Sequence, residues 1–151
     1  MNLFKYIKKI IKEKFTFVAP DNWGRCYYDI PKKELEIFTG KCYLISNTTS
    51  ALWFYYYHNG YKHNGNGPAE ILFWPPYKEI EAESFYWLGK KATNKYEYLD
   101  LEWRKEVTNI LLEKTNKNIQ ILKNHPSEKY NLNKEVEFLK YLKELLKNNC
   151  N

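Results

Sequence analysis

The sequence is poor in the two residues that most often interrupt regular structure: 151 residues contain only 6 glycines and 6 prolines. This scarcity excludes collagen-like and Gly/Pro-rich low-complexity classes. Long apolar runs are also missing. No stretch approaches the roughly 18 uncharged apolar residues that a transmembrane helix requires, so none is expected. The length predicts a single domain, residues 1–151, that buries roughly 70% of its unfolded surface.

Cysteine is scarce as well, with only Cys26, Cys42 and Cys150. Their number and spacing match neither a zinc-ligand pattern nor a dense disulfide framework. We expect Cys26 and Cys42 to be reduced, buried thiols; a bridge between two paired strands is the alternative. Cys150, one residue from the end, is expected to be exposed.

Aromatic residues are abundant, because 5 Trp, 14 Tyr and 8 Phe make up 18% of the chain. Disordered chains are poor in such residues, so a folded domain is expected. The formal charge is +6, and most of the excess lies near the two ends. The aromatic middle of the chain is close to neutral.

The first fourteen residues combine lysines with apolar residues at helical spacing, which predicts a basic amphipathic helix over 1–14. One side carries a basic patch, and the other carries an apolar stripe: Lys5, Lys8, Lys9 and Lys12 against Leu3, Phe4, Ile7, Ile10 and Ile11. The interleaved lysines exclude a signal peptide, so a cytoplasmic location is expected. Two interpretations remain open: attachment to an anionic membrane or acidic partner, or packing of the stripe on the body of the protein.

Residues 15–99 predict an antiparallel sheet of about five strands, arranged as a meander. Five segments are rich in aromatic and β-branched residues and bounded by Gly, Pro or Asn: 26–30, 41–45, 52–57, 70–74 and 85–88. Asn59-Gly60 predicts a tight turn, since both residues tolerate positive φ. The alternating acidic segment 79–83 fits either an edge strand or an acidic recognition patch.

Residues 100–148 predict helices, because the apolar period changes there from two to 3.6. Asp100 is a good N-cap for a helix that continues to about Leu122 and ends before His125-Pro126. A last helix is expected to begin near Asn133. Strands followed by helices define an α+β fold: an N-terminal helix, the sheet, and two C-terminal helices that pack on one sheet face.

An internal repeat is visible in the aromatic region. Residues 56–69 read YYHNGYKHNGNGPA, and residues 85–93 look like a shortened second copy whose Gly89 follows Gly60 by 29 positions. The first copy resembles a repeat of phage, viral and bacterial proteins, written aromatic-Tyr-x-Asn-Gly-x-x-His-x-x-x-Gly-Pro-Ala. It is similar, more distantly, to the MORN-type repeats of YwqK-group antitoxins. The resemblance covers residues 53–93, and it implies a binding scaffold from mobile genetic elements, with no catalytic role.

Aromatic residues in and beside these copies are the candidate partner-binding residues, because Tyr and Trp bring large contact area at small entropic cost. They are Trp53, Tyr55, Tyr57, Tyr61 and Trp87. His58 and His63 are the best candidates for a metal site or an acid–base pair, but no further ligand lies at useful spacing. The favoured interpretation is that His63 bonds turn backbone. No catalytic residue, metal or cofactor is predicted.

The sequence therefore favours a non-enzymatic, protein-binding accessory factor of a phage or mobile element. An inhibitor of a host defence system and a toxin-neutralising immunity protein both fit. The alternative is a nucleic-acid or nucleotide binder that stacks bases on Tyr and Trp beside basic terminal helices. The sequence leaves the identity of the partner and the oligomeric state open.

Overall fold

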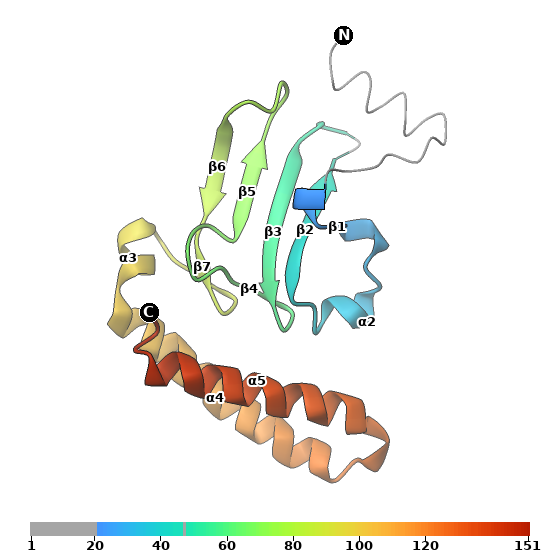
Figure 1. The fold of residues 1–151 in the computed structure, drawn as a ribbon, viewed down its shortest axis with the longest axis vertical. Helices are drawn as coiled ribbons and strands as arrows, with labels where there is room; N and C mark the ends of the chain where they lie inside the picture. Colours follow the sequence, from blue (N-terminus) through green and yellow to red (C-terminus); the bar gives the residue numbers. More distant parts are fainter. Residues whose placement is uncertain (1–20, 47) are drawn as a thin grey trace.

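A computed structural model describes residues 21–46 and 48–151, and it has the predicted α+β fold (Figure 1). The predicted helix over residues 1–14, with Lys5, Lys8, Lys9 and Lys12, lies outside the described residues. Within the described residues, no helix combines the length and the apolarity needed to cross a membrane.

The chain runs from a strand-rich half into a helical half. In chain order the elements are a 3-10 turn (Asp21–Trp23), β1 (Arg25–Cys26), a 3-10 turn (Tyr27–Asp29), α2 (Lys32–Leu35), β2 (Gly40–Ile45), β3 (Leu52–His58), β4 (Tyr61–Lys62), β5 (Glu70–Phe73), β6 (Ile80–Ser84), β7 (Tyr86–Trp87), β8 (Lys90–Lys91), α3 (Lys95–Leu99), α4 (Leu101–Lys123), a 3-10 turn (Pro126–Glu128) and α5 (Lys129–Lys147).

The main sheet has the order β1-β2-β3-β5-β6, with β4 paired to the end of β3. All pairs are antiparallel except β1–β2, which is parallel, so the meander is correct only from β2 to β5. The strand predicted over 85–88 does not join this sheet: Tyr86–Trp87 forms β7, which pairs with β8 in a separate hairpin, and β6 takes the place beside β5. The strand predicted over 26–30 is wrong beyond Cys26. There the chain makes a 3-10 turn before Pro31, which brings Ile30 into a buried cluster with Phe38 and Cys42. The acidic segment forms β6, a strand at the edge of the sheet, which confirms that interpretation of its sequence.

Side chains alternate along β3, so each face of the sheet carries its own set of aromatic residues. We call one side the tyrosine face: it carries Trp53, Tyr55 and Tyr57, and part of it packs against Tyr27, Ile30 and Phe38. We call the other side the phenylalanine face: it carries Leu52, Phe54, Ile71 and Phe73, with Trp23 and Tyr77 packed on it.

Helices α4 and α5 form an antiparallel pair, and local signals account for where α4 begins. The Asp100 carboxylate accepts hydrogen bonds from the N–H groups of Glu102 (2.9 Å) and Trp103 (3.4 Å), as expected of an N-cap. Helix α5 begins at Lys129, four residues before the predicted start. The short α3 was not predicted; its N-cap is Asn94, which accepts from the Glu97 N–H at 2.9 Å.

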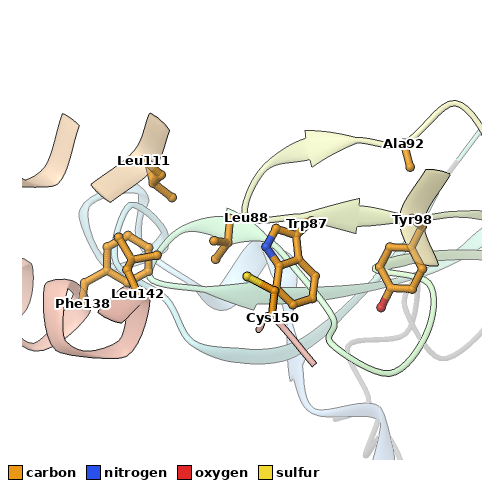
Figure 2. Close-up of a cluster of buried hydrophobic side chains, with 8 residues drawn as sticks. All are labelled: Trp87, Leu88, Ala92, Tyr98, Leu111, Phe138, Leu142 and Cys150. Atoms are coloured by element: carbon orange, nitrogen blue, oxygen red, sulfur yellow. The ribbon is translucent and has the colours of Figure 1, made fainter. Parts of the chain in front are cut away.

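The helical pair does not cover a face of the sheet, which corrects the predicted packing. It lies at the end of the sheet where β3 turns into β4 (Figure 1). Its core forms against the small β7–β8 hairpin and α3, and one buried cluster joins all three parts (Figure 2): Trp87, Leu88, Ala92, Tyr98, Leu111, Phe138, Leu142 and Cys150. The helical pair therefore covers neither face of the sheet, and within the described residues the segments around β1 and α2 pack on parts of them.

Candidate binding surface

The internal repeat is present in the structure as two equivalent hairpins. In β3–β4, Tyr57 pairs with Lys62 and His58 with Tyr61. In β7–β8, Tyr86 pairs with Lys91 and Trp87 with Lys90. Each residue of the second set lies 29 positions after its counterpart, so the register of the two hairpins is identical.

The turns of the two hairpins also match. Asn59 and Gly60 have φ values of 47° and 80°, and Leu88 and Gly89 have 49° and 86°. Two consecutive residues with positive φ form the turn that suits the twist of a two-residue hairpin loop. The predicted Asn59-Gly60 turn is therefore confirmed, and Leu88 adopts the same conformation in the second copy.

Each turn glycine also makes a close backbone contact. The Gly60 N–H donates to the Phe38 carbonyl at 2.9 Å, and the Gly89 N–H donates to the Lys62 carbonyl at 2.8 Å. A Cβ on Gly60 would lie 2.1 Å from the Glu36 carbonyl oxygen, which is an impossible contact. Glycine is thus required at position 60 by both φ and space.

His63 joins the two hairpins to α5. Its Nδ1 accepts the Leu88 N–H at 3.0 Å, and its Nε2 lies 3.1 Å from the Tyr141 hydroxyl. Because Nδ1 accepts a bond, the single proton of the neutral ring is on Nε2. Burial, with smaller contributions from His58 and Arg104, lowers the pKa of His63 to about 3. The expected bond from His63 to turn backbone is confirmed, and it reaches the turn of the second hairpin.

His58 is also part of the packing in this region. Its ring stacks on Tyr141 with centroids 3.8 Å apart, and burial lowers its pKa. Residues 21–46 and 48–151 contain no group of three or more His, Cys, Asp and Glu side chains that could hold a metal ion. The two histidines serve as neutral packing and hydrogen-bonding groups that link the hairpins to the helices.

The protonation state of His63 predicts a fall in stability with acid. The unfolded histidine takes up a proton near pH 6.5, whereas folded His63 resists protonation down to a pKa of about 3. The unfolded state therefore binds more protons between these values. The contribution of His63 to stability is therefore fully present above pH 6.5. Below that value, the free energy of unfolding decreases by up to about 1.4 kcal/mol per pH unit. Urea unfolding between pH 7 and pH 4.5 measures this slope.

Two variants test the assignment of that slope. His63→Gln removes one of two buried rings and is expected to reduce the slope, while lowering stability at pH 7 through the lost packing; His58, whose pKa burial also lowers, keeps its own contribution. His125→Gln, at an exposed loop position, is the control and is expected to keep the wild-type slope. An unchanged slope in His63→Gln would contradict the assignment.

Trp87, predicted as a partner-binding residue, is instead a core residue. Only 1% of it is exposed, and its Nε1–H donates to Thr108 Oγ1 at 2.9 Å. The Arg104 guanidinium lies between two aromatic rings, 4.5 Å from the centroid of Trp87 and 4.5 Å from that of Tyr98. Trp87 therefore offers no surface to a partner in this fold.

Arg104 also holds the C-terminus in place. Its Nε–H donates to the Tyr98 carbonyl at 2.6 Å, and its Nη1–H donates to the Cys150 carbonyl at 3.0 Å. Cys150 is fully buried, with its sulfur 3.5 Å from Thr108 Oγ1, so the expected exposure of this residue is wrong. Sequence reasoning did not select Arg104; its position on the buried stripe of α4, where arginine is rare, was the only signal.

All three cysteines are free in the structure, in line with the predicted reduced thiols. Cys42 is completely buried, and this burial raises its pKa to about 11. Cys26 is only half-buried. A thiol with a raised pKa carries little thiolate at neutral pH, so Cys42 is a packing residue of the sheet.

Three of the predicted partner-binding residues come together on the tyrosine face. The rings of Trp53 and Tyr55 are parallel within 3°, with centroids 6.1 Å apart, and Tyr57 follows 6.3 Å from Tyr55. All three side chains are half-buried. Tyr27 lies 6.0 Å from Tyr55 and extends the row to Tyr28, which is 66% exposed.

Tyr61, the fifth predicted residue, does not join this row. Its ring stacks on Phe138 of α5 with centroids 5.6 Å apart and planes within 14°. It therefore belongs to the contact between the first hairpin and the helices. Tyr27 and Tyr28 take its place at the surface. Sequence reasoning assigned them to a strand and did not select them as contacts.

The cations beside the aromatic row are paired with carboxylates. The Lys62 ammonium lies 5.1 Å from the Tyr55 centroid and forms an ion pair with Glu70. Arg25 forms an ion pair with Glu34. Burial raises the pKa of Tyr55 to about 12, so its hydroxyl stays a neutral donor at physiological pH. The row is thus a nearly neutral aromatic surface with hydrogen-bonding hydroxyl groups.

The fold is an α+β architecture in which two equivalent hairpins connect an aromatic sheet to a helical pair. No family model matches the chain, and neither a curated protein nor a solved structure shows significant similarity to it. The functional argument therefore depends on the chain's own geometry.

Proposed function

We propose that the chain is a non-enzymatic, protein-binding accessory factor that contacts its partner with the tyrosine face. The observation that supports this is the continuous aromatic row of Trp53, Tyr55, Tyr57, Tyr27 and Tyr28, which the helical pair leaves uncovered. Tyr and Trp dominate the energetic centres of protein interfaces. Trp53, Tyr55 and Tyr57 lie on strand β3 at the middle of the sheet, so their rings are held in place before binding. Tyr27 and Tyr28 extend the row from the 3-10 turn Tyr27–Asp29.

The charge near the row favours a protein partner over a nucleic acid. A groove that binds single strands needs unpaired cations along the backbone path. Here Lys62 and Arg25, the cations in contact with rings of this face, are neutralised by Glu70 and Glu34. The biological role remains that expected from the sequence: inhibition of a host defence system or neutralisation of a toxin, for a phage or mobile element. The two hairpins support a binding scaffold of the kind that the resemblance implies.

Capture experiments with matched variants test this function. The wild-type chain is expected to retain one protein partner from lysate of its native host, and nuclease treatment should leave the complex intact. Trp53→Ala with Tyr55→Ala should weaken the isolated complex by roughly 30-fold or more, the effect of losing about 2 kcal/mol at an interface centre. Tyr96→Ala with Tyr130→Ala removes two aromatic residues that are 86% and 63% exposed elsewhere, and should leave the affinity unchanged.

The outcomes separate the two classes of partner. Loss of all bound material after nuclease, or a steep loss of affinity between about 50 and 200 mM salt, would replace the protein-binding proposal with nucleic-acid binding. Equal affinity of the Trp53/Tyr55 variant and the wild type, with both folded by circular dichroism, would exclude the tyrosine face as the contact surface.

A further inference from the structure

The phenylalanine face carries a groove with a volume of about 320 Å³ and a lining of mixed polarity. Asn22 and Lys41 add polar groups, and apolar and aromatic side chains form much of the lining: Leu52, Phe54, Ile71, Phe73, Trp23 and Tyr77. Helices α4 and α5 do not contribute to its lining. An apolar sheet face is stabilised when a second apolar layer covers it. The question is which segment provides that layer.

The position of the chain favours a segment of the same molecule. Asn22 and Trp23 line the groove, so the twenty residues before Asp21 leave from its rim. A helix of fourteen residues is about 21 Å long. A sheet of five strands spans roughly 19 Å from first to last strand. Residues 1–14 therefore have the length to cross the whole face, and residues 15–20 can serve as the connection.

The pattern of residues 1–14 complements this face in polarity. The Lys41 ammonium lies 4.5 Å from the centroid of the Phe54 ring, and the part of the face beyond it, at Ile71 and Phe73, is apolar. The sequence predicts an apolar stripe of Leu3, Phe4, Ile7, Ile10 and Ile11 along one side of the segment. Opposite Phe73, Ile80 of β6 lies on the same face and is 52% exposed, which extends the apolar area toward the sheet edge.

The charges are complementary as well. Glu83 pairs in register with Ile71, so its side chain lies on the phenylalanine face at the edge of the sheet. Glu81 and Glu83 are exposed, and neither forms an ion pair with another described residue. Residues 1–14 carry five lysines and one glutamate, a net charge of +4. Opposite charges at the edge would set the direction in which the segment lies.

We propose that residues 1–14 dock on the phenylalanine face of their own chain, with the apolar stripe against Phe54, Ile71 and Phe73 and with lysines toward Glu81 and Glu83. This intramolecular contact completes the second layer of the sheet. It also removes the apolar stripe from contact with membranes while the segment is docked.

Nuclear Overhauser effects in the full-length chain, with labelled Ile methyl groups and labelled Phe rings, test the contact directly. The δ1 methyl groups of Ile7, Ile10 or Ile11 should show effects to the Ile71 methyl group or to the rings of Phe54 and Phe73. A sample mixed from differently labelled chains distinguishes contact within one chain from contact between two. Effects only between chains would overturn the proposal in favour of a second copy as occupant. Absence of any effect to the groove would overturn it altogether.

Variants that introduce a charge into the apolar stripe provide a second readout. Ile7→Asp with Ile11→Asp should shift the Ile71 methyl resonance and increase the fluorescence of the apolar dye ANS several-fold. Ile110→Asp with Ile121→Asp makes the same change at two exposed positions of α4 and should do neither. A different outcome would show that the proposal is wrong: the Ile71 methyl resonance does not shift in Ile7→Asp with Ile11→Asp, and the wild-type chain binds vesicles of phosphatidylcholine and phosphatidylserine. The apolar stripe would then contact a membrane and not the sheet.

Discussion

Replacement of Trp87 by alanine is expected to lower the free energy of unfolding by about 3–5 kcal/mol, the range for removing a large aromatic side chain from a core. The ring is 1% exposed and lies at the junction of the second hairpin, α4 and the C-terminus. Its removal also leaves the Arg104 guanidinium without one of its two aromatic neighbours and leaves Thr108 without its donor. Urea unfolding followed by circular dichroism measures the loss.

Trp74→Ala is the matched control for this prediction. Trp74 is 40% exposed beyond the end of β5, so its removal should cost less than about 1 kcal/mol. Trp87→Phe keeps much of the volume but loses the bond to Thr108, and we expect an intermediate effect. Equal losses for Trp87→Ala and Trp74→Ala would show that the helical pair does not pack on the hairpin as described.

Replacement of Gly60 by alanine is expected to cost on the order of 3 kcal/mol, because two penalties combine. The φ of 80° is unfavourable for any residue with a Cβ, at about 1–2 kcal/mol. The new Cβ would also lie 2.1 Å from the Glu36 carbonyl oxygen, so backbone must move and the bond from the Gly60 N–H to the Phe38 carbonyl is strained. For a chain of this length, the melting temperature should fall by roughly 6–12 °C.

Gly65→Ala supplies the control within the same motif. Nothing lies within 4 Å of a Cβ at Gly65, and the φ of Gly65 is not in the left-handed region. The melting temperature of the Gly65→Ala protein should therefore change little. A similar decrease for both variants would mean that the loss reflects general glycine entropy rather than the close approach of α2 to the first hairpin turn.

Local signals in the sequence determined the elements that depend on neighbouring residues. The aromatic and β-branched runs defined β2, β3 and β5, the Asn59-Gly60 pair defined the first hairpin turn, and Asp100 defined the start of α4. The spacing of 29 between the two copies was also visible, and the structure shows two hairpins with the same register. Each of these features is set by φ preference, alternation or capping within a few residues.

Tertiary packing alone decided which aromatic residues are at the surface. Trp53 and Trp87 both lie in aromatic strands, yet Trp53 is half-buried on a face that α4 and α5 do not cover, and Trp87 is in the core. The difference arises because α4 and α5 pack on the second hairpin and on His58 at the end of β3, and not on the part of β3 that carries Trp53. The burial of Cys150 and Arg104 follows from the same contact, which joins α4 to the last residues of the chain. The contact between Trp87 and Thr108 joins residues 21 positions apart, and that between Arg104 and Cys150 joins residues 46 positions apart. Contacts at such separations leave no local pattern, so only the folded structure could place them.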